Sequence, residues 1–336
     1  MTEPQVDPEG MFGWVDPVRR SADGRPYIIG PCPNAHPEPS EAIPSDHYCV
    51  EGRVPSAKRE GKTVQCPKCK GVGWIETLYT RCTTFVSAME ESSALAAWKL
   101  RLVLTGVALD ARNVSERRII DELVEIDFDE PGEADLFTLT TKQQIDAIAE
   151  HAFEIADGHL KAKKGTTLHE LSELVDRQEP LPPETTDQER ADLGAYVRVV
   201  ESLGLVMLES ELFVVNDELK IAGTLDRLCG SKTEALCDQC ELPVIVDLKT
   251  GRVDYGAGKI AQQLAVYSRS KRYDPVSGAR SELGACPHKG IVIHLPQGTG
   301  EAEPLLVDLE AGYGGALMSR DVRQYRNASK KWLSPL

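Results

Sequence analysis

The sequence of 336 residues lacks any apolar run near the ~18 residues that a membrane-spanning helix needs. Its first ten residues, MTEPQVDPEG, also lack the basic and then apolar pattern of a secretory signal. No internal repeats are visible. From these absences we expect a cytoplasmic protein with no membrane partner.

An overall excess of basic charge is missing as well. The formal net charge is −15, which argues against a broad nonspecific coat of nucleic acid. The total conceals a pattern, however. Residues 121–135 hold eight acids and no base, whereas residues 53–70 carry six basic residues against the single acid Glu60. Local basic surfaces therefore leave a nucleic-acid partner open.

What the chain does have is the composition of an ordinary globular protein, with 41% hydrophobic and 27% charged residues. Residues 1–80 are rich in Pro, Gly and charge, and they predict an irregular extension. Residues 81–336 have helical and then β-rich periodicity, which predicts one α/β domain. Helices come first, and a hairpin-rich mixed sheet that carries a further helix follows them.

Nine cysteines are many for a cytoplasmic chain. In a reducing compartment, paired cysteines are metal ligands more often than disulfides. The stretch CPKCKGVGW contains Cys66 and Cys69 in the shape of a zinc knuckle, and Cys32 and Cys49, or a histidine, would complete four ligands. The alternative is a reduced, partly buried turn without a metal.

The chemistry-bearing stretch of the sequence runs from residue 221 to residue 267. In PVIVDLKTG, Asp247 and Lys249 end an apolar β-branched run, and the side-chain period of a strand places both on one face. Asp226 ends Gly-Thr-Leu-Asp after another strand. Two carboxylates and an ammonium at one sheet edge predict a site for a hard cation beside a charged catalytic group. The alternatives are a salt bridge on an edge strand for the first pair and a turn residue for Asp226.

Two predicted helices add weaker signals. His169 follows KKGTT and lies four residues before Glu173, on the same helix face. Gln263 and Tyr267 share a face in the same way, on the helix after the Asp-Leu-Lys strand. Each pair has a plain alternative, namely a core or surface histidine and a half-buried polar stripe. Their fixed order along the chain makes the set stronger than its members.

That order, GTTLH, then GTLD, then DLK, then Gln263-x-x-x-Tyr267, resembles the PD-(D/E)XK nuclease superfamily. The similarity is to its RecB-like exonuclease branch, which includes the CRISPR-adaptation exonucleases and relatives in phages of actinobacteria. It covers roughly residues 80–330. The resemblance implies a restriction-endonuclease-like core, with a mixed central sheet flanked by helices and preceded by a helical segment.

The resemblance also implies roles for single residues. His169, Asp226 and Asp247 would be metal ligands, with the Leu248 carbonyl as a further oxygen ligand. Lys249 would be the catalytic lysine, and Gln263 and Tyr267 would position substrate and lysine. Hard oxygen ligands suit Mg²⁺ or Mn²⁺, and an imidazole among them favours Mn²⁺.

The cysteines depart from that family. Its iron–sulfur members use three clustered cysteines near the C-terminus, whereas only Cys286 lies downstream of the motifs here. We therefore expect no iron–sulfur cluster of that type. Cys229, Cys237 and Cys240 instead fall between the GTLD and DLK strands, where the Cys-x-x-Cys pair, Cys229 and one more ligand would bind structural zinc at a hairpin tip. The alternative is a set of unrelated thiols.

The expected function is a metal-dependent DNA exonuclease in phage recombination, replication or repair, acting in the host cytoplasm if a phage encodes it. A phage recombinase, an annealing protein or a helicase would then be partners besides DNA. Two alternatives stay open. One is a structure-specific endonuclease, and the other is a non-catalytic adaptor that binds nucleic acid.

Overall fold

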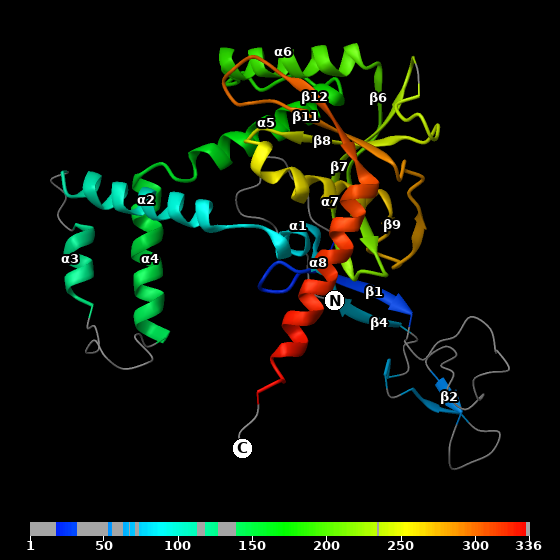
Figure 1. Ribbon diagram of the computed structural model, residues 1–336, viewed down its shortest axis with the longest axis horizontal. Coiled ribbons are helices and arrows are strands. Elements are labelled where there is room, and N and C mark those ends of the chain that lie inside the picture. Colours follow the sequence, from blue (N-terminus) through cyan, green and yellow to red (C-terminus); the bar gives the residue numbers. More distant parts are fainter. Residues whose placement is uncertain are drawn as a thin grey trace.

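The computed structural model (Figure 1) describes residues 18–31, 53–55, 63–66, 68–70, 74–112, 118–126, 139–233 and 235–333. None of the helices in these ranges is by itself long and apolar enough to cross a membrane. One bent pair, Cys82–Met89 with Ser93–Asp110, reaches that length and composition only when the two are taken together.

An eight-stranded sheet forms the centre of the fold, as predicted (Figure 1). Two of its strand pairs, β8 with β11 and β5 with β7, are parallel, and the other pairs are antiparallel. The sheet is therefore mixed. Its strands, in spatial order, are β10 (Arg280–Glu282), β9 (Lys271–Tyr273), β6 (Leu205–Asn216), β7 (Ile221–Ser231), β8 (Val244–Lys249), β11 (Lys289–His294) and β12 (Glu303–Asp308), with β5 (Thr80–Arg81) beside β7.

The long β6–β7 hairpin turns at the Asn-Asp pair that predicted it. Asn216 accepts a hydrogen bond from the Leu219 N–H at 2.9 Å, so its side chain closes the turn. The pairing of the two strands is regular near the turn and shifts between Met207 and Glu209. Farther along β6, Glu211 has φ of 49°, which is rare for a residue with a Cβ.

Helices cover both faces of the sheet. On one face, Tyr196 and Val199 of α6 (Asp187–Ser202) pack against Val244, Val246 and Leu248 of β8. On the other, Ile245 packs with Leu264 of α7 (Ala257–Ser268) and Leu309 of α8 (Leu309–Ser329). The alternation along β8 follows directly from the two-residue period of a strand. Both faces of this strand are buried, which explains its continuous apolar run.

Two contacts fix the helices beside the sheet. In LPPETTDQER the sequence offers a Thr/Asp cap candidate, and the cap of α6 is Thr186, whose hydroxyl accepts from the Glu189 N–H at 3.2 Å, while Glu189 reaches back to the Thr186 N–H. Helix α8 lies so close to α7 that a Cβ at Gly312 would stand 2.3 Å from the Ala261 carbonyl oxygen. Glycine is therefore required there to let the two helices touch.

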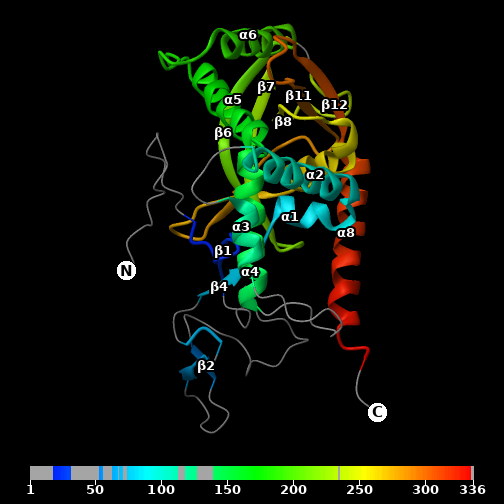
Figure 2. The same ribbon diagram turned by 90° about the vertical axis from the view of Figure 1, so that its left-hand side faces the viewer.

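A helical arm extends from one side of the sheet (Figures 1 and 2) and consists of α2 (Ser93–Asp110), α3 (Ile119–Val124) and α4 (Leu139–Ile155). Ile119, Ile148 and Ala152 form its core. Helical spacing in SAMEESSALAAWKLRLVLTGVALD predicts one long helix over residues 87–110, but its first part is the 3-10 turn Ser87–Met89, which continues α1 (Cys82–Val86), and the chain breaks before α2. The Glu91 carboxylate accepts from the Ser93 N–H at 2.7 Å, which starts a new helix at the polar EESS segment.

The region expected to be irregular contains two short antiparallel pairs in its described part. They are β1 (Tyr27–Pro31) with β4 (Trp74–Leu78), and β2 (Arg53–Pro55) with β3 (Thr63–Gln65). Ile28 and Tyr79 pack against Val215 and Ala222 of the central sheet. The division of the chain at residue 80 stays a prediction.

Candidate active site at the end of strand β8

The centre of the candidate site is Asp247, which is 2% exposed near the end of β8. Lys249 lies on the same face, as predicted, and its Nζ is 2.5 Å from Asp247 Oδ2. This buried oxygen is therefore paired with the Lys249 ammonium, and among the described residues no other donor reaches it. A buried carboxylate with one cationic partner can accept a further positive group.

Asp226 and His169 approach from β7 and from helix α5 (Leu160–Asp176). Asp226 Oδ2 accepts a hydrogen bond from the Leu248 N–H at 3.1 Å. His169 Nδ1 lies 3.6 Å from the same oxygen, a distance beyond a good hydrogen bond. The imidazole also makes a hydrogen bond to the Leu248 backbone, and this bond favours the protonated form of His169. His169, Asp226 and Asp247 therefore surround the backbone of Leu248, the fourth predicted ligand residue.

The electrostatics of the site favour a cation. Burial, followed by the neighbouring Asp226 charge, raises the pKa of Asp247 to about 7 against the opposing pull of Lys249. Burial lowers the pKa of His169 although Asp226 opposes this, so the imidazole is neutral at pH 7 and has a lone pair to donate. Burial also works to lower the pKa of Lys249, but Asp247 and Asp226 outweigh it, and its net pKa is raised.

Gln263 and Tyr267 lie on α7, where their side chains are hydrogen-bonded to each other. Tyr267 is buried, and a Cβ at Gly223 would stand 2.6 Å from its phenol oxygen. The glycine of Gly-Thr-Leu-Asp is thus the residue that gives Tyr267 its place beside β7. Burial, then the nearby Cys82, and also the charges of Asp226 and Asp247, hold the pKa of this phenol well above its usual value.

A second glycine brings α5 to the site. A Cβ at Gly165 would stand 2.8 Å from Thr250 Oγ1, so α5 passes directly over the residue that follows β8. His169 lies one turn farther along the same helix. The glycine of GTTLH is therefore required by the close approach that places the histidine.

Arg227, which the sequence analysis did not single out, holds α5 against the sheet. It is 2% exposed, and its guanidinium donates to Asp176 Oδ2 at 2.7 Å and to Ser172 Oγ at 2.5 Å. Both partners are on α5, one and two turns beyond His169. This buried ion pair therefore connects the strand of Asp226 to the helix of His169. An arginine directly after Asp226 within a strand was the available signal.

Glu211 was also missed, and it faces Asp226 from β6. Partial desolvation of its carboxyl, and then the charges of Asp226 and Glu173, raise the pKa of Glu211 to about 7, although the residue as a whole stays exposed. Burial also raises the pKa of Glu173, the predicted companion of His169. The acidic side of the site is therefore wider than the two predicted carboxylates. The unusual φ of Glu211 could not be foreseen from LESELF, which shows only ordinary strand alternation.

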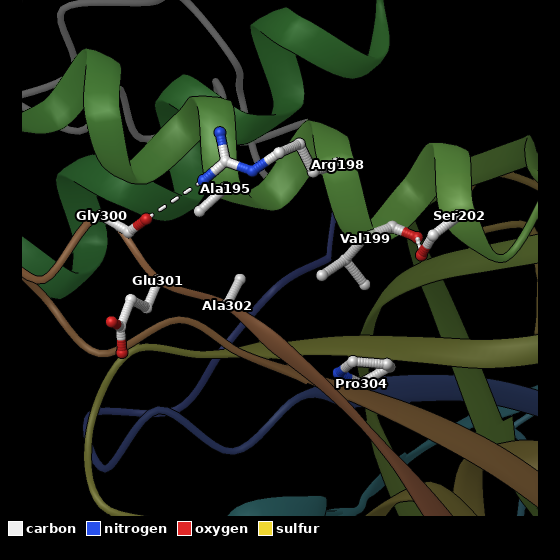
Figure 3. Close-up of a pocket in the computed structure, with 8 residues that line it drawn as sticks. All are labelled: Ala195, Arg198, Val199, Ser202, Gly300, Glu301, Ala302 and Pro304. Carbon is white, nitrogen blue, oxygen red and sulfur yellow. Dashed lines mark hydrogen bonds between the residues drawn. The ribbon is translucent and has the colours of Figure 1, made fainter.

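The donor set suits a divalent metal. Two carboxylates, a neutral imidazole and a backbone carbonyl are ligands that Mg²⁺ and Mn²⁺ accept, and the buried Asp247 carboxylate, whose pKa is raised by burial and by Asp226, is a group that such an ion would stabilise in its charged form. A surface hollow between α6 and the segment before β12 (Figure 3) lies elsewhere. Arg198 donates there to the Gly300 carbonyl at 3.2 Å, and Glu301 is the one acid in its lining. One carboxylate is too few to hold a divalent metal by itself, so this hollow is a poor candidate for metal chemistry.

The cysteines fall into two places. Cys66 and Cys69 are both buried, in a turn closed by a hydrogen bond from the Lys70 N–H to the Cys66 carbonyl, but their predicted partners Cys32 and Cys49 lie outside the described residues. Cys237 and Cys240 are grouped with Cys286. Cys229, expected to join them, is buried in β7 and is not part of that group.

No protein-family model matches this chain, and no curated protein matches it either.

Proposed function

We propose that this chain is a Mg²⁺- or Mn²⁺-dependent deoxyribonuclease of the PD-(D/E)XK type, acting as a DNA exonuclease. The observation that carries the proposal is the convergence of His169, Asp226 and Asp247 around the Leu248 backbone, with Lys249 beside them. These residues are scattered over 81 positions of sequence, from 169 to 249, and meet at one end of β8. The mixed sheet with a hairpin, β8 and a parallel β11 supports a restriction-endonuclease-like core.

In this proposal His169, Asp226, Asp247 and the Leu248 carbonyl hold the metal. When bound, such a cation lowers the pKa of a coordinated water and offsets negative charge on phosphate oxygens. Lys249 stays charged, since its pKa is raised, and it orients the attacking water and stabilises the charge that develops on the phosphate. Gln263 and Tyr267, which share one face of α7, position the substrate and Lys249 in this proposal.

The resemblance to RecB-like exonucleases adds the substrate and the setting. DNA is the proposed substrate, and phage recombination, replication or repair is the proposed process. A recombinase, an annealing protein or a helicase would be a partner in that setting. These proposals rest on the order of the motifs along the chain.

The experiment compares end-labelled linear DNA with circular single-stranded DNA, each in Mg²⁺, in Mn²⁺ and in EDTA. We expect the linear substrate to be degraded in either metal and not in EDTA. Asp247→Ala and Lys249→Ala should each lower the rate by at least about a hundredfold, the scale of a lost general acid–base group. Asp321→Ala and Lys271→Ala are matched controls, because these exposed residues pair with Arg320 and Glu282 away from the site.

The outcomes separate the competing functions. Cleavage of the circular substrate would favour a structure-specific endonuclease at the same site. Salt-sensitive DNA binding without hydrolysis in any metal would favour an adaptor. Full activity in Lys249→Ala or Asp247→Ala would refute the proposed mechanism.

A further inference from the structure

Three cysteine sulfurs meet at the end of β8 opposite to Asp247. The Sγ atoms of Cys237, Cys240 and Cys286 all lie within 4.8 Å of one another. Cys240 Sγ and Cys286 Sγ are 3.3 Å apart, although 46 positions separate them in the sequence. The first two cysteines belong to the link between β7 and β8, and the third precedes β11. The fold therefore assembles this group from two separate segments.

The backbone around these sulfurs is shaped to donate to them. The Gln239 N–H donates to Cys237 Sγ at 3.4 Å, and the Lys289 N–H donates to Cys286 Sγ at 3.3 Å. In both cases the chain turns back within two or three residues of its cysteine. The Cys286 N–H also donates to the Pro243 carbonyl at 2.7 Å, which ties the two segments together. Sulfurs that receive N–H donors are suited to carry negative charge, as metal-bound thiolates do.

Two other interpretations explain less of this geometry. A disulfide needs its sulfurs at ~2.05 Å and joins only two of them, which leaves the third thiol unexplained. Ordinary thiols in an apolar core have no reason to collect N–H donors. Zinc–sulfur bonds of ~2.3 Å in a tetrahedron place sulfurs roughly 3.8 Å apart, which three sulfurs at these distances reach with small movements.

We propose that Cys237, Cys240 and Cys286 bind one zinc ion as a three-thiolate site, without Cys229. Among the residues that the structure describes, no further cysteine, histidine or carboxylate joins the three. Water therefore fills the fourth position of the tetrahedron. This site is independent of the proposed nuclease function, and either proposal can fail alone.

The position of the site indicates its role. Strands β8 and β11 are parallel neighbours, so no hairpin turn joins them. Cys240 lies four residues before β8, and Cys286 lies three residues before β11. A zinc ion between them would cross-link the beginnings of the two strands and thereby hold the register of β8.

The test measures zinc in the purified full-length chain. It uses the Cys66→Ser/Cys69→Ser background, which removes the other cysteine pair. We expect one zinc per chain in this background, the same content after a further Cys229→Ser change, and at least a tenfold lower content after Cys286→Ser. Cys229 is the matched control because it is a buried thiol outside the group. Zinc retained at full content in Cys286→Ser would overturn the proposal.

A second measurement leaves all three cysteines of the site unchanged. Cobalt substituted into the same background should give intense thiolate-to-cobalt charge-transfer absorption, which the exposed group of Glu150, Glu154 and His159 cannot produce because it has no sulfur. Absence of that absorption would overturn the proposal. So would a Cys240–Cys286 disulfide in the unreduced chain, or iron with acid-labile sulfide in place of zinc.

Discussion

Opposite kinds of chemistry lie at the two ends of the six-residue strand β8. At its end, Asp247 and Lys249 meet Asp226 and His169, a set of hard oxygen and nitrogen donors. Before its beginning, Cys240 meets Cys237 and Cys286 in a group of soft sulfur donors. Both ends gather groups from distant segments, because β8 lies in the middle of the sheet.

The different donor atoms at the two ends of β8 suit different roles: the oxygen and nitrogen donors suit a reactive site, and the sulfur donors suit a structural one. Oxygen ligands bind Mg²⁺ or Mn²⁺ loosely enough for exchange with water and substrate, while three thiolates hold zinc far more firmly. The charged end is kept in place by helices α5 and α7. The sulfur end would be kept in place by the metal itself. Three changes can test this division.

The largest effect is expected for Arg227→Met. This change removes the buried cation that joins β7 to α5 and leaves the Asp176 carboxylate without its ion-pair partner, although the Tyr196 hydroxyl still donates to it at 2.7 Å. We expect the free energy of unfolding to fall by about 3–5 kcal/mol, the usual result of breaking a buried pair. Denaturant titration measures it, with the exposed Arg252→Met as a control that should change stability by less than about 0.5 kcal/mol.

The same variant also tests whether the two ends of β8 are independent. Arg227 anchors the charged end, so its loss should leave the zinc content unchanged. The destabilisation should add to that of Cys286→Ser, as it does for independent sites. Strong coupling between the two changes would show that the ends of β8 form one unit.

A smaller effect is expected for Gly223→Ala. The added Cβ would stand 2.6 Å from the Tyr267 phenol oxygen and must displace it. We expect a loss of about 1–3 kcal/mol in the free energy of unfolding, as for other overpacked sites, together with a lower rate of DNA cleavage. Gly258→Ala on the same helix as Tyr267 is the control, because its Cβ would meet nothing within 4 Å. An unchanged rate of DNA cleavage in Gly223→Ala would show that the position of Tyr267 does not matter for the chemistry at the charged end of β8.

The smallest effect is expected at Asp217, which is remote from both ends. Burial works to raise the pKa of Asp217, but hydrogen bonds from Arg280 and Tyr79 outweigh it, so its pKa is lowered on folding. A lowered carboxyl pKa contributes stability that is present above the ordinary value of 3.8 and is lost as the pH falls through the lowered value.

Thermal unfolding followed from pH 7 down to pH 3 measures this contribution. Wild type should be more stable than Asp217→Asn near neutral pH, and the difference should shrink in acid. A difference that grows in acid would contradict the sign. The result also provides the baseline for any comparison of the two ends of β8 at low pH.

Much of the fold was accessible from the sequence because its signals are local. The apolar run before Asp247 predicted a buried strand, the Asn-Asp pair predicted the hairpin, and the Thr/Asp segment before α6 predicted a helix cap; all three are confirmed. The break before α2 was missed because helical spacing continues through it. The spacing carries no information on where a polar segment will begin a new helix.

In the candidate site, too, residues with local signals were found from the sequence, and residues that depend on distant partners were missed. Asp247 and Lys249 were found as neighbours because strand periodicity fixes their common face. Cys286 was set aside as a single downstream cysteine, since nothing in a sequence records that a loop 46 positions away will return to Cys240. Arg227 and Glu211 were missed for a related reason. Their meaning depends on partners from other elements, which only the folded chain supplies.

Leu248 contributes to the charged end in a way that side-chain mutagenesis does not detect. Its side chain is buried against α6, while its backbone N–H binds Asp226 and its backbone faces His169. A scan of substitutions would therefore rank position 248 by volume and polarity alone, as for any core leucine. Among apolar residues only proline would expose the second role, since it removes the N–H. Replacing the amide at this position by an ester would isolate that role, because it changes one backbone atom and leaves the leucine side chain in place.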